Sequence, residues 1–449
     1  MSVWNTVHVG SFLNERKDRF EPDEANKLGL KRLYKIDFSG KIHLLDDKQT
    51  NTGMILVKKG DLVISGINVE KGAIAVYQGD GDILATIHYS SYEFDKSKID
   101  VGYFTWFLRS QTFRDVVQSQ VRGGIKTELK PKHFLPLKIN LPDLPIQQKI
   151  KKRIGGVSNE IKEINELDVN NEDYVTKLRQ AILQEAVSGK LVPQDQKDEP
   201  ASELLKKIKV EKEKLIREKK IKKDKPLPPI TEEEIPYELP KGWEWVRLGD
   251  ITKIIAGNSF LSQDFNEIKG KKVIKITNCG VKEFVETDDY LPEHFIDEYT
   301  DFLIHEKDLV IALTRPYISN GLKICKCPAS YNNSLLNQRV AAIKNKFKIN
   351  FEYLHYFLTT DFVLNKYQSR FRNSGLQPNL KMEDLTLLEV PLPPLPEQIR
   401  IVEKVDQLMK LCDELEEKVQ ENQTNTGLLM EAVLREAFEV KESGSIGTD

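Results

Sequence analysis

The chain contains an internal duplication, which constrains its fold more than any other feature of the sequence. Residues 124–150 (GIKTELKPKHFLPLKINLPDLPIQQKI) align without a gap to residues 375–401 (GLQPNLKMEDLTLLEVPLPPLPEQIRI), and ten of the 27 positions are identical. The same shift of 251 residues (375 − 124) pairs Ala181-Ile-Leu-Gln-Glu-Ala186 with Ala432-Val-Leu-Arg-Glu-Ala437. Such a repeat indicates one structural unit used twice. Each half is therefore expected to hold an ordered domain of about 140 residues, followed by a long segment of different character.

The charge balance excludes several classes of protein. The 449 residues include 67 Lys and Arg and 69 Asp and Glu, which give a formal net charge of −2. No overall basic field surrounds such a chain, so any contact with nucleic acid must come from local patches. No run of 18 apolar residues occurs, and the first twenty residues hold no apolar segment, so we expect neither a membrane span nor a secretory signal. Because the four cysteines are irregularly spaced, we expect reduced thiols and a cytoplasmic protein.

Short apolar or alternating runs bounded by Gly, Asp and Asn predict β-strands in both halves. These runs lie at Val57–Ser65, Gly72–Tyr77, Ile83–His88, Val273–Thr277, Asp308–Leu313 and Gln338–Ile343. Apolar residues at helical spacing predict one helix over Tyr103–Val117 and another over Tyr353–Tyr367. The predicted fold class is α+β, with two tandem α/β domains.

A long helix is predicted after each domain. The stretches Pro142–Pro145 and Pro391–Pro396 mark helix starts, because Pro is tolerated in the first turn of a helix and not inside it. Apolar residues then recur at spacings of three and four, as in helices that pack along their length. We expect the two helices to pair antiparallel, because the halves are related by an approximate two-fold axis. Local breaks are expected at Asn170-Asn171 and Asn422–Gly427. The residues predicted to form the seam are Ile150, Ile154, Val157, Ile161 and Ile164, and Ile401, Val405, Leu408, Cys412, Leu415 and Val419.

These features divide the chain into six parts and predict two pseudo-two-fold-related domains separated by two long antiparallel, coiled-coil-like helices. The parts are a first domain (1–140), a first spacer helix (141–192), a basic and Pro-rich connector (193–240), a second domain (241–391), a second spacer helix (392–441) and a flexible tail (442–449). Residues 206–225 of the connector carry eleven Lys or Arg and four acids. A contact with nucleic acid or a partner subunit, and a solvated amphipathic connector, are both open interpretations of this stretch.

Motifs of nucleotide, cofactor and metal chemistry do not occur in the sequence. There is no Walker A pattern, no glycine-rich dinucleotide or S-adenosylmethionine fingerprint, no Asn-Pro-Pro-aromatic tetrapeptide, no HExxH and no paired CxxC. Cys325-Lys-Cys327 with Cys279 is a weak zinc pattern that lacks the spacing of a finger or ribbon, so incidental thiols explain it better. A duplicated chain without a cofactor motif is more typical of a binding protein than of an enzyme. We therefore predict no catalytic residue and no metal ligand.

The candidate nucleic-acid contacts are loops in which basic and amide side chains stand next to glycine or turn residues. Arg suits guanine edges and phosphates, whereas Asn and Gln suit adenine edges. For each single Arg, a solubilising surface charge is the alternative interpretation. The loops are Glu15–Arg19, Gln120–Thr127, Thr314–Tyr317, Tyr331–Ser334, Asn337–Arg339 and Gln368–Gln377. The residues predicted to bind DNA are Arg16, Lys17, Arg19, Arg122, Lys126, Thr127, Arg315, Asn332, Asn333, Arg370, Arg372, Asn373 and Gln377.

The motifs at the repeat boundaries resemble those of a known family, the specificity subunits of type I restriction-modification systems. Leu392-Pro-Pro-Leu-Pro-Glu-Gln398 resembles the family's helix-start motif, and Leu141-Pro-Asp-Leu-Pro-Ile-Gln147 resembles a degenerate first copy with Ile146 where Glu is usual. Residues 178–193 are similar to the family's central conserved region, and residues 239–249 are similar to the start of its second recognition domain. Each motif alone is weak, but the combination is specific and covers nearly the whole chain.

The resemblance implies two target-recognition domains separated by two antiparallel helices. It implies a noncatalytic subunit that binds a bipartite, asymmetric site in double-stranded DNA. It also implies partners, namely two modification subunits that carry S-adenosylmethionine and methylate adenine, and restriction subunits that use ATP and magnesium. No cofactor is expected on this chain. Because recognition domains vary within the family, no base-contacting residue can be carried over. A scaffold that binds proteins only and a self-contained DNA-modifying enzyme are the alternatives.

Overall fold

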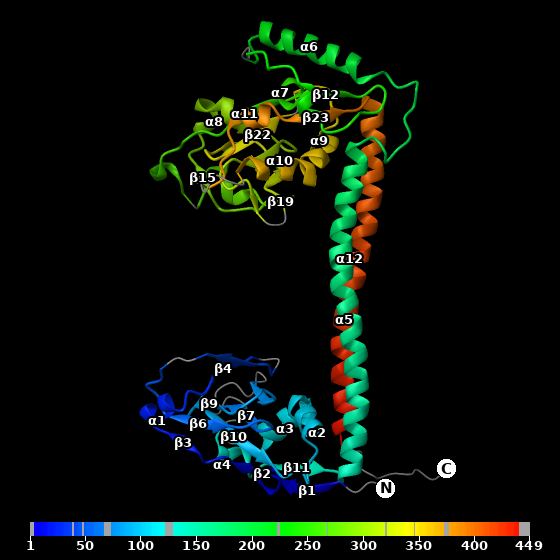
Figure 1. Ribbon diagram of the computed structural model, residues 1–449. Helices are drawn as coiled ribbons and strands as arrows, with labels where there is room; N and C mark the ends of the chain where they lie inside the picture. The colour runs from blue at the N-terminus through cyan, green and yellow to red at the C-terminus, as the bar shows by residue number, and fades with distance from the viewer. Residues whose placement is uncertain are drawn as a thin grey trace, which may run out of the picture. The chain divides into compact units, whose positions relative to one another are not determined.

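The structure is a computed structural model that describes residues 4–37, 40–46, 49–66, 73–121, 129–221, 225–266, 268–318, 321–344, 346–371 and 377–439. The chain forms two compact units, which are described one at a time. Unit 1 comprises Met1–Asn171 and Lys418–Asp449, and unit 2 comprises Glu172–Glu417. Each unit holds one α/β domain together with part of α5 (Leu144–Val187) and part of α12 (Leu395–Phe438) (Figure 1).

The domain of unit 1 is built on two sheets and a separate strand pair. The strand orders are β2-β10-β7-β8, β3-β6-β9-β4-β5 and β1-β11. Helices α2 and α3 follow the sheets in sequence. The elements are β1 (Asn5–His8), β2 (Leu13–Glu15), β3 (Arg19–Phe20), α1 (Pro22–Lys27), β4 (Arg32–Ile36), β5 (Ile42–Leu45), β6 (Met54–Val57), β7 (Leu62–Ser65), β8 (Ile74–Val76), β9 (Ile83–Thr86), β10 (Tyr89–Phe94), α2 (Val101–Arg109), α3 (Gln111–Gln120), α4 (Pro131–Phe134) and β11 (Lys138–Leu141).

The domain of unit 2 repeats this topology. Its sheet β13-β22-β17-β20 corresponds to β2-β10-β7-β8, and its sheet β15-β14-β21-β16 corresponds to β5-β4-β9-β6, with the parallel pair β14–β21 matching β4–β9. The duplication predicted from the sequence is therefore confirmed. The elements are β12 (Glu244–Arg247), α7 (Leu248–Ile251), β13 (Lys253–Ala256), β14 (Lys271–Ile274), β15 (Tyr290–Leu291), α8 (Phe295–Glu298), β16 (Leu303–Ile304), β17 (Leu309–Ala312), β18 (Tyr317–Ile318), β19 (Gly321–Leu322), β20 (Ile324–Lys326), β21 (Ser334–Leu336), β22 (Val340–Lys344), α9 (Phe351–Leu358), α10 (Asp361–Phe371), α11 (Met382–Thr386) and β23 (Glu389–Leu392).

The central strands are buried on both faces, which explains their continuous apolar sequence. In β7, Leu62 and Ile64 pack in the cluster that contains Phe104 of α2. Val63 packs instead with residues of the second sheet, including Ile83 of β9. Strand β17 divides its side chains between two clusters in the same way. Each such Leu or Ile contributes about 1.5–3 kcal/mol by leaving water, so the sheet is the rigid base of the domain.

Capping residues divide three of the elements predicted as continuous. The run Val57–Ser65 spans β6 and β7, which are joined by a turn in which Asp61 accepts a hydrogen bond from the amide of Lys58 (2.9 Å). The helix predicted over Tyr103–Val117 is two helices, α2 and α3, because the Ser110 hydroxyl accepts the amide of Phe113 (3.2 Å) and starts a new helix. Thr360 separates α9 from α10 in the same manner. A single cap leaves the apolar spacing intact, so the pattern alone does not reveal the break.

A buried glutamine fixes the start of each long helix to its domain. The side-chain carbonyl of Gln147 accepts the amide of Asp100 (2.8 Å), and its NH₂ group donates to the carbonyl of Pro142 (2.8 Å). The carbonyl of Gln398 accepts the amide of Asn350 (2.8 Å), and its NH₂ group donates to Pro393 (2.9 Å). Asp100 and Asn350 are the N-caps of α2 and α9. One side chain thus joins a helix cap, a strand end and a long helix in both copies.

The second copy adds a carboxylate to this junction. Glu397 stands where the first copy has Ile146, and it accepts hydrogen bonds from the Trp243 indole (3.0 Å) and the Gln194 amide (3.0 Å). Burial raises the pKa of Glu397 above its usual value, although the hydrogen bonds from these two donors act to lower it. Arg400 pairs with Asp198 nearby (2.6 Å). Gln194 and Asp198 belong to the connector, which packs against the second junction. We attribute the replacement of Ile146 by Glu397 in the second copy to this contact with the connector.

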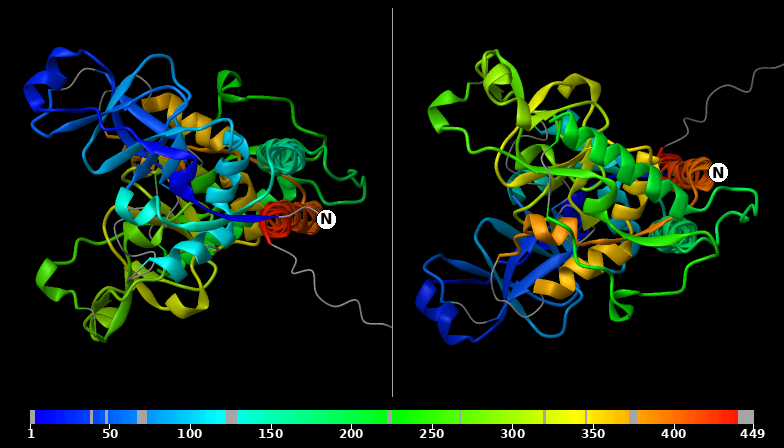
Figure 2. Two further views of the ribbon diagram at one scale, coloured as in Figure 1. Left: turned by 90° about the horizontal axis from the view of Figure 1, so that it is seen from below. Right: turned by 90° about the horizontal axis from the view of Figure 1, so that it is seen from above.

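Helices α5 and α12 run antiparallel in each unit. In unit 1, Arg153 pairs with Glu436 (2.9 Å), and the Thr426 hydroxyl donates to Asn165 (3.1 Å). In unit 2, Arg179 pairs with Asp413 (2.7 Å) and Glu416 (2.8 Å). Rising numbers on α5 therefore meet falling numbers on α12, and the end-on views show the two helices side by side (Figure 2). At 1.5 Å per residue, each 44-residue helix is about 66 Å long.

The breaks expected at Asn170-Asn171 and Asn422–Gly427 were wrong, because both helices run through these positions. Asn and Gly lower helix propensity by at most about 1 kcal/mol per residue. Packing against a partner helix outweighs such a cost. Along the middle of the pair, burial recurs every seven residues, at Ile154, Ile161, Asp168, Val175 and Ile182 on α5 and at Val405, Cys412, Val419 and Thr426 on α12.

The connector contains a helix that is part of the second domain. Helix α6 (Ala201–Arg217) packs Ala201, Leu204 and Ile208 into the core of unit 2. Lys206 and Lys207 are exposed and pair with Glu203 and Glu199, whereas Lys212 is half-buried and donates to the carbonyl of Gly249 (3.3 Å). Among the described residues, no helix is both long and apolar enough to cross a membrane.

Replacing Gln398 by Ala should lower the free energy of unfolding by about 2–4 kcal/mol, because the amide of Asn350 and the carbonyl of Pro393 lose a buried partner. Urea unfolding of the full chain, followed by circular dichroism, measures this loss. The control Gln420→Ala, at an exposed position of α12, should change the value by less than about 0.5 kcal/mol. Equal effects of the two substitutions would contradict a structural role for Gln398.

Candidate nucleic-acid interface

Loops of unit 2 meet at the end of strand β17. The amide of Leu313 donates to the carbonyl of Arg339 (2.8 Å), and the amide of Arg315 donates to the carbonyl of Pro378 (2.9 Å). The amide of Leu380 closes the group by donating to Leu313 (2.8 Å). These backbone bonds hold the loops that follow β17, β21 and α10 in one place.

The loop after β13 approaches the same place closely. The amide of Gln338 donates to the carbonyl of Asn258 (2.7 Å). A Cβ atom at Gly257 would lie only 1.9 Å from the carbonyl oxygen of Asn337, so this position requires glycine. Four loops from separate parts of the chain therefore form one fastened surface.

Polar side chains project from this surface into solvent. We call the exposed residues Arg315, Gln338, Arg339, Gln377 and Asn379 the loop cluster. In the part of the chain that the structure describes, neither Arg315 nor Arg339 has an ion-pair partner. Guanidinium and carboxamide groups are the side chains that bind base edges in the major groove. Of the residues predicted to bind DNA, the structure brings Arg315 and Gln377 together here.

The backbone is strained at both arginines of the loop cluster. Arg315 has a φ of 48° and Arg339 has a φ of 70°, in the left-handed region that side chains with a Cβ avoid. Each such residue costs about 1–2 kcal/mol. Strain of this kind persists only where the surrounding hydrogen bonds determine the conformation, and it is concentrated at functional sites.

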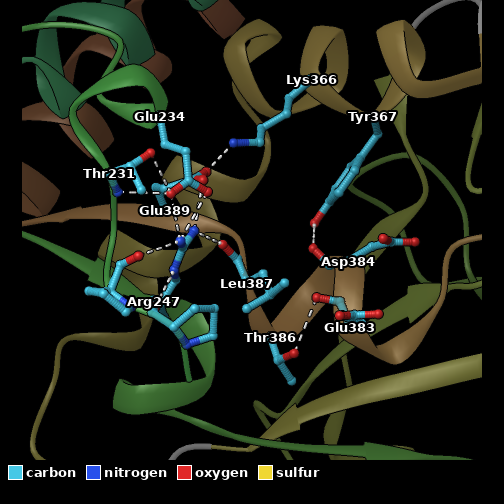
Figure 3. A network of polar contacts seen from close by, with 12 residues as sticks. Thr231, Glu234, Arg247, Lys366, Tyr367, Glu383, Asp384, Thr386, Leu387 and Glu389 are labelled. Carbon is cyan, nitrogen blue, oxygen red and sulfur yellow. Dashed lines mark hydrogen bonds and ion pairs between the residues drawn. The ribbon is translucent and has the colours of Figure 1, made fainter. Parts of the chain in front are cut away.

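Other basic residues of unit 2 are bound inside the domain. The Arg247 side chain is 4% exposed and pairs with Glu234 (2.8 Å) and Glu389 (2.9 Å), and Lys366 pairs with the same Glu389 (Figure 3). Arg370 of α10 pairs with buried Asp384 of α11. The fold thus gives Arg370 a partner, and its predicted contact with DNA stays a prediction.

Asn332 and Asn333 lie away from the loop cluster. The side-chain carbonyl of Asn332 accepts a hydrogen bond from the amide of Glu306 (3.1 Å). Glu306 precedes strand β17, whereas Arg315 follows the same strand. Asn333 is exposed, with a φ of 61°. The two ends of a four-residue strand are about 10–13 Å apart, so the predicted DNA-binding residues of unit 2 do not form a single group.

In unit 1, Arg16 follows β2 and is held by a buried carboxylate. Its guanidinium donates to both oxygens of Asp61 (2.6 and 2.9 Å), which raises the pKa of Arg16. Lys17 and Arg19 are exposed, and Arg19 begins β3. The predicted residues Arg122, Lys126, Thr127, Arg372 and Asn373 lie outside the described residues.

The weak zinc pattern is a group of buried thiols. Cys279 and Cys325 have their sulfurs 3.8 Å apart, and both lie in the core of unit 2 with Cys327. Burial raises the pKa of Cys327 to about 12, which opposes the thiolate form that binds zinc. Within the described ranges, no group of three or more His, Cys, Asp or Glu is placed to hold a metal.

The residues predicted for helix pairing differ in burial. Ile154, Ile161, Ile401 and Val405 are buried, and Ile150, Val157 and Leu408 are partly buried. Leu415 is 45% exposed, so it lies outside the seam within this chain. Along the middle of α5 and α12, a buried residue recurs once in seven residues. The apolar residues at the positions between are therefore exposed to solvent.

The sequence offers little signal for four residues of the interface, namely Asn258, Gln338, Arg339 and Asn379. Asn258 and Asn379 stand in no predicted loop, and they join it only through the contacts of the folded chain. Gln338 and Arg339 lie in the predicted loop Asn337–Arg339, but neither is among the individual residues predicted to bind DNA. A signal exists in the duplication, because the turn before β22 corresponds to the turn before β10.

Comparison with known proteins agrees with this architecture. The family model described as the type I restriction modification DNA specificity domain matches residues 240–423. The type I restriction enzyme EcoAI specificity subunit of Escherichia coli is 42% identical over 247 residues, which covers 54% of this chain and 41% of that protein. The EcoEI specificity subunit of the same organism is 32% identical over 273 residues, which covers 56% of this chain and 43% of that protein. The matched segments thus span less than half the length of these relatives.

A solved structure shows the same fold over almost the whole chain. The HsdS subunit from Thermoanaerobacter tengcongensis aligns with a TM-score of 0.53 over 97% of this chain and 96% of that chain, at 18% identity. Residues 240–423 thus match a type I restriction modification DNA specificity domain, and about half of the chain is similar to specificity subunits of type I restriction enzymes.

Proposed function

We propose that the chain recognises a bipartite site in double-stranded DNA as the noncatalytic specificity subunit of a type I restriction-modification complex. The observation that carries this proposal is the repeated sheet topology of the two domains, found in a chain that contains the family's specificity domain. A scaffold used twice suits a target in two parts. Different exposed loops on the same scaffold suit a target whose two parts differ in sequence.

The charge distribution supports recognition through local groups. The net charge of −2 gives no general attraction for phosphates. The loop cluster instead presents two arginines and three carboxamides on a rigid support. Base contacts of this kind contribute about 1–3 kcal/mol each. Phosphate contacts made partly by other subunits would supply the remaining affinity.

The exposed flank of the helix pair suits partner subunits. In unit 2, Tyr174 and Leu178 on α5 and Leu411 and Leu415 on α12 are exposed. Helical spacing places all four on the flank away from the ion pairs of Arg179, so they share one face of the helix pair. Apolar residues in such a row bind the apolar face of another helix. We assign this face to the modification subunits.

The cofactors belong to the partners in this proposal. S-adenosylmethionine would bind the modification subunits, and ATP and magnesium would bind the restriction subunits. This chain would supply DNA specificity and the docking surface.

The test of the function is the pattern of DNA modification in a host that expresses this chain with its modification subunits. We expect methylated adenine within a motif of two short halves and a fixed spacer. Absence of any motif would contradict recognition and favour a protein-binding scaffold. Methyl transfer or cleavage by the purified chain alone, with DNA, magnesium and S-adenosylmethionine, would contradict a noncatalytic subunit.

Exchange of residues 1–140 for the first domain of another family member should change one half of the methylated motif and leave the other half unchanged. The reason is that the domain of unit 1 has its own sheets and core. Sequencing of modified bases measures both halves at once. A change in both halves would contradict modular recognition.

The double substitution Leu178→Glu and Leu411→Glu should weaken binding of the modification subunits by about 100-fold or more, because two apolar contacts worth about 1.5–3 kcal/mol each are lost. Titration of the labelled modification subunit with the chain measures the affinity. Gln184→Glu adds a charge at an exposed position of α5 that is not at i+3, i+4 or i+7 from Leu178, and it should leave the affinity unchanged. Equal affinity for the double variant and the native chain would remove this face from the interface.

A further inference from the structure

The turn that precedes β10 in unit 1 and the turn that precedes β22 in unit 2 occupy the same place in the fold. Tyr89 of β10 pairs with Ser65 of β7, as Val340 of β22 pairs with Ala312 of β17. One residue earlier, the carbonyl of His88 accepts the amide of Gly66 (2.9 Å). The carbonyl of Arg339 accepts the amide of Leu313 in the same way (2.8 Å). The registers therefore make His88 and Arg339 equivalent.

The next link of the scaffold is also repeated. Gly66 accepts the amide of Leu129 (3.1 Å), and Leu313 accepts the amide of Leu380 (2.8 Å). In both units, the segment that leads back to the long helix is tied to the same strand end. The backbone that carries the turn is thus fastened identically in the two domains.

The side chains on the two turns are different. Unit 1 presents Ile87 and His88, whereas unit 2 presents Gln338 and Arg339, and all four are exposed. Ile87 is 54% exposed, although an apolar β-branched side chain gains nothing from contact with water. In the major groove, Ile suits the thymine methyl group, Arg suits the O6 and N7 atoms of guanine, and Gln suits adenine.

The strain is located at the turn of unit 2. Six non-glycine residues of the described chain have a positive φ, and two of them are Arg315 and Arg339 in neighbouring loops. The left-handed backbone of Arg339 is held by the bond to Leu313, and it presents an exposed guanidinium that has no acidic partner among the described residues. A strained residue whose side chain has no acidic partner inside the described part of the domain points to a role for that side chain outside the domain.

We propose that these two turns are the equivalent base-contacting elements of the two recognition domains. Ile87 and His88 bind base edges in one half-site, and Gln338 and Arg339 bind base edges in the other, with Arg315 and Gln377 beside Arg339. Arg339 donates to a guanine, and Ile87 contacts a thymine methyl group. The inference rests on the proposed function, and it adds which residues distinguish one base pair from another.

The test uses the full chain assembled with its modification subunits and a pool of DNA duplexes with randomised positions. The motif selected by the native complex is compared with the motif selected by the Arg339→Gly variant. The preference at one base pair of the second half-site should fall by about 5- to 150-fold, the range of one bidentate contact. The first half-site should not change, and His88→Ala should show the converse pattern.

Glycine at position 339 separates base contact from folding. Because glycine accepts a positive φ without strain, Arg339→Gly should unfold at an equal or higher urea concentration than the native chain. Lys307→Gly is the matched control, since Lys307 has a φ of 68° and precedes β17, on the side away from the loop cluster. This variant should show the same effect on unfolding and no change in the motif.

Three outcomes would overturn the inference. A native motif that both Arg339→Gly and His88→Ala retain unchanged would show that the turns do not contact bases. A loss of affinity that is uniform across all sequences would assign Arg339 to phosphate instead. A native complex that selects no motif would overturn the proposed function itself, and this inference with it.

Discussion

The hydrogen bonds of one buried glutamine per copy hold the architecture together. Gln147 and Gln398 each join the N-cap of the first domain helix to the carbonyl that ends a strand and opens a long helix. A buried amide or carbonyl left without a partner costs about 1–3 kcal/mol, so alternative angles between strand and helix are disfavoured. Helices α5 and α12 both begin at a junction that is fixed in this way. The repeated Gln is thus the point at which the α/β domain and the helix pair become one structure.

The sheets provide the second constraint, because their strands form the core while the turns at their ends lie at the surface. Strands β7 and β17 bury side chains on both faces, which leaves them no freedom to vary without loss of the core. The exposed turns at the ends of these strands can vary in sequence without loss of core packing. Exposed loops on a rigid support are where binding residues occur in many folds. The contrast between Ile87-His88 and Gln338-Arg339, on one backbone scaffold, is the clearest case in this chain.

The helix pair uses only part of its apolar surface internally. Burial once in seven residues is less than a two-stranded seam with two apolar positions in each heptad would give. Leu411 is 58% exposed and Leu178 is 46% exposed. At the same height of the helix pair, Arg179 forms its ion pair with Asp413 on the opposite flank. Exposed leucines in a row are unfavourable in water. The proposed docking of partner helices would bury these residues, and it would link the proposed DNA recognition to the modification subunits.

The sequence by itself determined the duplication, the two long helices and the mixed α/β class, because repeats, proline positions and apolar spacing are local patterns. It did not reveal the caps at Ser110 and Thr360, since one polar residue leaves the spacing unchanged. It also did not distinguish the arginines. Arg16 and Arg370 are held by Asp61 and Asp384, whereas Arg315 and Arg339 stand free of carboxylates in the described chain. Only the tertiary structure decided this, because a carboxylate 45 residues away along the chain becomes a partner only when the sheet brings it there.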